Sequence, residues 1–90
     1  MEDEFSKFLE QEVVIDTKSS YLFIGRLQKV GDFFLVMEDV DVHDQSDFNK
    51  TKEIYVMEAA KYGIKINRKQ VNIVKSEMIS ISLLGDIVKY

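Results

Sequence analysis

A glycine interrupts the longest run of strand-like sequence in this chain. The stretch FIGRLQKVGDFFLVMEDV, residues 23–40, has Gly25 inside its first apolar segment and Gly31 between its two segments. The chain has only four glycines and no proline, so two glycines this close together need a structural reason. A glycine inside a strand usually marks a bend, a bulge or a close backbone approach. We therefore expect Gly25 to let its strand bend and Gly31-Asp32 to form the next turn.

Alternation of apolar and polar residues predicts five short strands, because successive side chains of a strand point to opposite faces. The third strand starts with an uninterrupted apolar run and ends in alternation, a pattern typical of a sheet that curls into a barrel. The expected strands cover residues 13–17, 21–30, 33–43, 69–75 and 78–84.

Helical spacing occurs before the first strand. Phe5, Phe8 and Leu9 lie at positions i, i+3 and i+4, and acidic residues precede them. Acidic side chains are favourable near the N-terminus of a helix, where the helix dipole is positive. The pattern predicts an amphipathic N-terminal helix over residues 3–11.

A second helix is expected between the third and fourth strands, over residues 52–62. Asn49 or Thr51 can cap its N-terminus, and Gly63 follows its last turn. The predicted fold class is therefore mainly β: a small, strongly bent, five-stranded antiparallel barrel of the SH3-like type. An N-terminal helix and an inserted helix accompany the barrel.

Length and composition predict one domain, spanning residues 1–90. The chain is 46% apolar, yet no segment approaches the roughly 20 apolar residues of a membrane-spanning helix. Its start is acidic, whereas secretory and mitochondrial signals begin with basic residues. With no cysteine, the chain has no disulfide or thiolate metal site, as expected in a reducing compartment. We expect a cytoplasmic protein that does not associate with membranes.

The net charge of −4 is unevenly distributed. Residues 32–47 contain six acids and no Lys or Arg, and residues 61–75 contain five basic residues and no acid. One interpretation is that the two segments lie side by side and neutralise each other across strands. The other is that the basic segment, with Arg68 and Lys69, lines a phosphate-binding rim.

The single histidine does not predict an enzyme. His43 stands among aspartates, which suggests a metal site or an acid–base pair. However, Asp39, Asp41 and His43 alternate along one expected strand, so they share one face, and we expect that face to be solvated. We predict no catalytic residue, no metal site and no cofactor.

The order of elements resembles the Sm/LSm family of RNA-associated ring proteins. The first motif of that family contains Gly-x-Leu, then a loop bearing Asp, then an apolar run that ends in acids. Here residues 25–27 (GRL), Asp32 and residues 34–39 (FLVMED) take these places. The second motif resembles residues 74–81 (VKSEMISI), with Lys75 where Arg is usual and Ser76 where Gly is usual.

The resemblance implies a binding site for single-stranded RNA at the inner rim of a ring. In the family, an aromatic or His side chain of the Asp-bearing loop stacks on a base, an Asn reads the base edge and the basic residue holds the pocket. Phe33 and Lys75 would take the stacking and holding roles, whereas Phe34 replaces the Asn and has no donor or acceptor. In the alternative interpretation, both phenylalanines belong to the core. The implied RNA-binding residues are Asp32, Phe33, Phe34, Arg68, Lys69 and Lys75.

Ring formation follows from the same resemblance. The fourth and fifth strands would be sheet edges, and exposed edges need a partner. In the family, the fifth strand of one copy pairs with the fourth strand of the next, so we expect a cyclic homo-oligomer. Two alternatives remain: a protein–protein scaffold on the same fold without RNA binding, and a monomeric OB-fold module that binds single strands.

Overall fold

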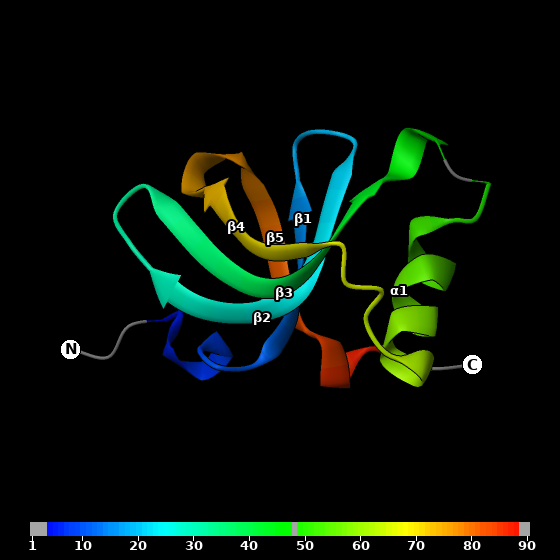
Figure 1. Cartoon of the computed structure of the whole chain (residues 1–90), viewed down its shortest axis with the longest axis horizontal. Helices are drawn as coiled ribbons and strands as arrows, with labels where there is room; N and C mark the ends of the chain where they lie inside the picture. Colours follow the sequence, from blue (N-terminus) through cyan, green and yellow to red (C-terminus); the bar gives the residue numbers. More distant parts are fainter. Residues whose placement is uncertain (1–3, 48, 89–90) are drawn as a thin grey trace.

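The computed structural model describes residues 4–47 and 49–88, and Figure 1 shows a curved antiparallel sheet with one α-helix at its side. The order of strands in the sheet is β4-β3-β2-β1-β5. All five predicted strands are confirmed, with ends that differ by no more than one residue. The strands are β1 (Glu12–Thr17), β2 (Tyr21–Val30), β3 (Phe34–Asp44), β4 (Arg68–Val74) and β5 (Met78–Leu83).

The sheet bends where Gly25 of β2 meets β3, as the sequence predicts. Ile24 lies opposite Asp41 and Arg26 lies opposite Glu38, so β3 has one extra residue there. Asp39 occupies this bulge with a φ of 52°, a left-handed conformation. A Cβ atom on Gly25 would lie 3.1 Å from three backbone atoms of residues 38–40, so only glycine fits without displacing β3.

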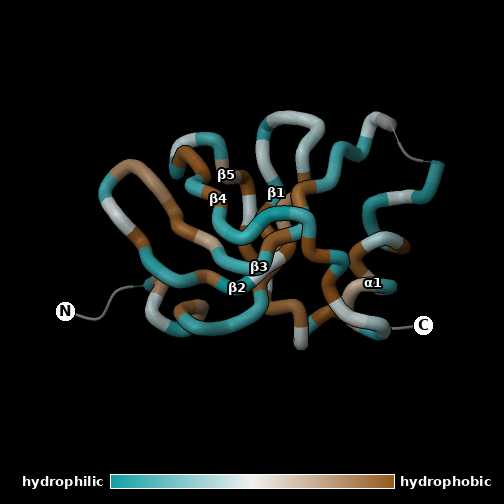
Figure 2. Tube along the Cα trace, in the orientation of Figure 1, coloured by the Kyte–Doolittle hydropathy of each residue, from teal (hydrophilic) through white to brown (hydrophobic). Residues whose placement is uncertain are grey.

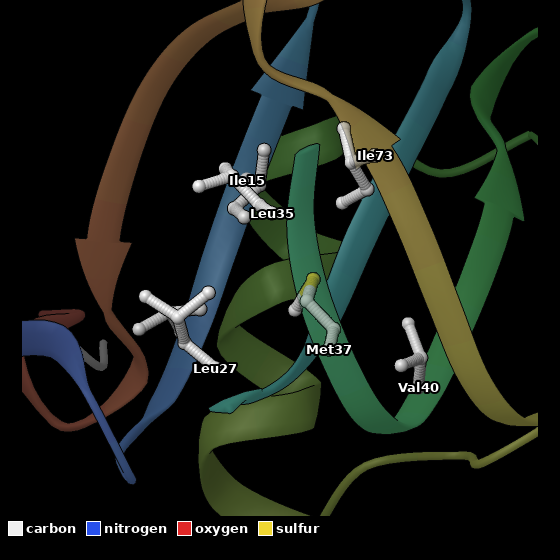
Figure 3. Close-up of a cluster of buried hydrophobic side chains, with 7 residues drawn as sticks. Ile15, Leu27, Leu35, Met37, Val40 and Ile73 are labelled. Carbon is white, nitrogen blue, oxygen red and sulfur yellow. The ribbon is translucent and has the colours of Figure 1, made fainter. Parts of the chain in front are cut away.

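The inner face of the bent sheet holds the main core. Its side chains come from four strands, β1 to β4, and Figure 3 shows them converging on one interior. In the hydropathy view, hydrophobic segments likewise gather where the strands cross (Figure 2). Partly buried residues of β5 pack against the same core. The buried members are Val13, Ile15, Leu27, Leu35, Met37, Val40 and Ile73.

The predicted inserted helix is α1 (Lys52–Tyr62), and it packs on the outer face of the sheet. The Thr51 side chain caps its N-terminus by accepting a hydrogen bond from the backbone N–H of Ile54. Gly63 ends the helix with a φ of 101°. The helix buries its residues Tyr55, Val56 and Ala59 against Val14, Leu22 and Ile24 of the sheet. None of the described helices is long and apolar enough to cross a membrane.

The predicted N-terminal helix is wrong over the described residues. Only a single 3₁₀ turn, η1 (Ser6–Phe8), forms there, and residue 3 of the prediction lies outside the described residues. The backbone N–H of Glu10, whose φ is 65°, donates to the carbonyl of Leu27, and the N–H of Leu27 donates to the carbonyl of Gln11. Because these backbone groups form hydrogen bonds with β2, they are not available for the hydrogen bonds of a helix that extends to residue 11. The expected apolar stripe still packs against the inner core.

The predicted solvation of the histidine face is also wrong, because α1 covers it. The side chains of Asp41 and His43 are buried, and the His43 ring stacks on the Tyr55 ring with centroids 3.7 Å apart. The Tyr55 hydroxyl and the Asn67 amide both donate to the Asp41 carboxylate. Asp39 stays exposed because the bulge turns it away from this face. Asp41 and His43 thus form, with Tyr55, a polar contact that holds α1 on the sheet.

Candidate nucleic-acid interface

The two loops that carry the predicted binding residues meet at the end of the molecule opposite α1 (Figure 1). One is the β2–β3 turn, in which the backbone N–H of Gly31 donates to the carbonyl of Phe34 over 2.8 Å. The other is the 3₁₀ turn η3 (Lys75–Glu77), between β4 and β5. Because Val74 pairs with Phe34, the chain leaving β4 runs directly against the β2–β3 turn.

Lys75 joins the two loops through both its backbone and its side chain. Its backbone N–H donates to the carbonyl of Phe33 over 2.7 Å, and its Nζ donates to the carbonyl of Gly31 over 3.2 Å. The ammonium group also lies 5.0 Å from the centre of the Phe5 ring, a cation–π distance. These contacts fix a positive charge beside the turn.

The two phenylalanines of the turn are exposed, so their assignment to the core is wrong. The exposed fraction is 76% for Phe33 and 49% for Phe34. Asp32, at the start of the same turn, is exposed as well. Since a large apolar ring usually avoids water, two of them beside a fixed ammonium group make this turn a candidate binding surface.

Arg68 and Lys69 do not join this cluster. They begin β4, where Arg68 pairs with Val40, whereas Val74 at the other end of the strand reaches the β2–β3 turn. The acidic and basic segments do lie side by side, since β3 pairs with β4, as one interpretation of the charge pattern expected. The basic partner of Glu38 and Asp39, however, comes from β2. Glu38 forms an ion pair with Arg26 of β2 over 2.9 Å, and Asp39 lies 4.0 Å from the same guanidinium group.

The described side chains of this turn supply exposed aromatic rings, and Lys75 supplies a charge. Phe33 offers an open aromatic face, which is worth about 1–3 kcal/mol per stacked base. Lys75 offers a point charge and rotating donors, without the planar fork of Arg. Phe34, the second exposed ring of the turn, has no hydrogen-bonding group in its side chain. Among the described residues, no three His, Cys, Asp or Glu side chains are grouped as metal ligands.

Sequence reasoning missed one member of this cluster, Phe5. Its helical spacing with Phe8 and Leu9 suggested a core-facing stripe, whereas its ring also lies against the Lys75 ammonium group. No local signal links residues separated by most of the chain. The contact depends on how the chain before β1 packs against the core.

Comparison with solved structures identifies the fold. The sequence matches no protein-family model and no curated protein. The structure is similar to that of the Pyrococcus abyssii Sm protein in complex with a uridine heptamer, with a TM-score of 0.60. The match covers 91% of this chain and 99% of that chain, at 16% sequence identity. This chain therefore has a divergent Sm-like fold. The match confirms the resemblance of the motifs at the level of the fold, and it favours the Sm-like fold over the OB-fold alternative.

Proposed function

We propose that this chain is a non-enzymatic Sm-like ring protein that binds single-stranded RNA at the inner rim of its ring. The observation that carries the proposal is the junction of the two loops, where Lys75 is hydrogen-bonded to the β2–β3 turn beside the exposed Phe33 ring. Exposed aromatic rings next to a positive charge suit the stacked bases and phosphates of a single strand. The similar Sm protein was solved with a uridine heptamer.

The sheet edges support assembly. β4 and β5 stand at opposite ends of the strand order, and each pairs with one neighbour, β3 or β1. Unpaired strand edges favour pairing with another chain. In the proposed ring, β5 of one copy pairs with β4 of the next, and repetition of this head-to-tail contact closes the ring. The β4–β5 turns, with Lys75, would then surround the central opening.

The proposed site predicts which single strands bind. Because Phe34 cannot read a base edge, we expect oligouridine and oligoadenine to bind with similar affinity. The affinity of both should fall as salt rises, since bound phosphates release counterions. Arg68 and Lys69 lie away from the stacking site, so they would contact only a strand that extends beyond the inner rim.

Fluorescence titration of labelled oligouridine and oligoadenine at two salt concentrations tests the proposal. Phe33→Ala and Lys75→Ala should each weaken binding about tenfold, the loss expected for one stacked base or one phosphate contact. Tyr62→Ala and Lys61→Ala are matched controls, because both residues are exposed and lie on α1, outside the two loops. Equal affinities for all four variants would contradict the proposed site.

A protein–protein scaffold on the same fold is the second candidate. The net charge of −4 favours it, because a negative chain repels RNA at long range. The same titration separates the two candidates. If the oligomeric protein binds neither oligonucleotide at low salt, the RNA proposal is wrong and the scaffold function takes its place.

A further inference from the structure

An apolar groove of about 500 Å³ runs between α1 and the outer face of β1 and β5. Val14 and Val56, from the core beneath α1, form part of its floor, and Met57 of α1 and Ile87 line its walls. Ser80 and Ser82 of β5 form the side next to the sheet edge, and both are exposed. The groove is therefore open on the side where β5 lacks a partner strand.

Exposed apolar side chains border this groove and also occur at the opposite edge of the sheet. At the groove, Ile54 is 42% exposed and Val88 is 68% exposed. At the other edge, Ile66 lies in the extended segment just before β4 and is 57% exposed. Each of the two sheet edges thus has an aliphatic side chain that is exposed to solvent.

The two edges carry opposite charges. Residues 76–86, which include β5, contain Glu77 and Asp86 and no Lys or Arg. Glu53 of α1 lies at the groove, and the two other charged residues that line it, Lys52 and Asp16, form an ion pair with each other over 2.6 Å. Residues 61–75, which include β4, contain no acid. Among the residues that the structure describes, no ion pair uses Arg68 or Lys69. This charge difference favours contact between unlike edges over contact between like edges.

Antiparallel pairing determines which parts of the two edges meet. If β4 of one copy runs antiparallel to β5 of another, the start of β4 lies beside the end of β5. The end of β5 leads to Asp86 and Ile87, at one end of the groove. The start of β4 is preceded by Ile66 and carries Arg68 and Lys69. An apolar side chain flanked by positive charges would thus face an apolar groove flanked by negative charges.

We propose that the groove between α1 and β5 binds the segment around Ile66 of a second copy of this chain. Ile66 enters the groove, and the basic residues after it lie near Asp86 and Glu53. The inserted helix then serves as a wall that holds the neighbouring subunit in addition to the strand pairing. This inference rests on the proposed ring and adds to it a specific contact between side chains.

A mass measurement across a concentration series tests the anchor. Ile66→Ser should raise the concentration at which the oligomer dissociates about tenfold or more, because truncating a buried anchor removes most of its contact energy. Tyr62→Ser is the matched control, since Tyr62 is 79% exposed and does not line the groove. Far-UV circular dichroism establishes that both variants stay folded.

Cross-linking tests the contact directly, since the chain has no cysteine of its own. One tagged copy carries Ile54→Cys, a second copy with a different tag carries Ile66→Cys, and the two are co-expressed. A disulfide-linked species that contains both tags then shows that the two introduced cysteines come from different molecules. We expect mild oxidation to yield the mixed dimer. If the second copy carries Tyr62→Cys in place of Ile66→Cys, we expect no mixed dimer.

The outcomes separate this inference from the ring itself. A wild-type protein that stays monomeric at all concentrations overturns both. If Ile66→Ser and Tyr62→Ser dissociate at the same concentration and no mixed dimer forms, the groove contact is wrong. The proposed ring is not affected by that result. Loss of RNA binding with intact assembly affects only the RNA site.

Discussion

The backbone of β3 passes close to Gly25 of β2 at the bend of the sheet. The hydrogen of glycine leaves room for the β3 backbone, three atoms of which lie 3.1 Å from where a Cβ atom would stand. The bulge at Asp39 uses the same space, because its extra residue turns β3 toward Gly25. One missing side chain therefore allows the sheet to bend.

Gly25→Ala should destabilise the fold by about 1–3 kcal/mol, the usual cost of forcing extra atoms into a packed region. The added methyl group would lie 3.1 Å from backbone atoms, which cannot move aside as a flexible side chain can. Urea denaturation measures the change. Gly85→Ala is the control, because a Cβ atom there meets nothing within 4 Å. Equal stability of the two variants would show that the close approach at Gly25 is not required.

The helix α1 is held to the sheet by a buried hydrogen bond as well as by apolar contacts. The Tyr55 hydroxyl donates to the buried Asp41 carboxylate, and the His43 ring stacks on Tyr55. Burial raises the pKa of Tyr55 above its ordinary value, and the bond to Asp41 raises it further. Both causes favour the neutral hydroxyl, since a phenolate beside a carboxylate would add a second negative charge.

Tyr55→Phe should cost about 1–3 kcal/mol at neutral pH, because Asp41 loses a donor while it stays buried. The cost should shrink above about pH 10, where an unfolded tyrosine loses its proton. There the folded protein still holds the proton, so the unfolded state binds fewer protons and the stability of the wild type falls as pH rises.

Urea denaturation at about pH 8 and about pH 11 measures both effects. Tyr62→Phe is the control, because Tyr62 is exposed and lies on the same helix. A stability difference between Tyr55→Phe and the wild type that stays constant up to the higher pH would contradict the assigned pKa direction.

The whole molecule has two unlike edges on one bent sheet. The β4 edge is basic and the β5 edge is acidic, and both edges lack a partner strand within the described chain. The proposed head-to-tail assembly would join unlike charges at every contact, whereas pairing of two like edges would place the same charges together. The charge distribution thus favours an assembly with one repeated contact.

Assembly should therefore weaken as salt increases from about 0.05 M to about 0.5 M, because ions screen exposed charge pairs. Sedimentation velocity at several protein concentrations measures the dissociation. The charge reversal Asp86→Lys should weaken assembly at low salt, and adding Arg68→Glu to it should restore part of the loss. The control combines Asp86→Lys with Lys29→Glu, because Lys29 is exposed and lies in β2, which has a neighbouring strand on each side. If Arg68→Glu restores assembly no better than Lys29→Glu does, the pairing of charges is contradicted.

Local patterns determined the elements of this protein. Period-two alternation located all five strands, because side-chain direction depends on neighbours in the sequence. Capping residues marked the limits of α1: the sequence offered Asn49 or Thr51 as the N-cap, of which the structure uses Thr51, and Gly63 after the last turn. The resemblance to the Sm/LSm motifs also implied that Phe33 and Lys75 would belong to one site. The structure brings their loops together through β3–β4 pairing.

Contacts between distant segments decided the rest. Residues 3–11 have a helical pattern, yet β2 takes the backbone groups of Glu10 and Gln11. Asp41 and His43 alternate as solvent-facing residues do, yet α1 covers them. In each case the free energy depends on a partner far away in the chain, and periodicity within a short segment carries no information about that partner.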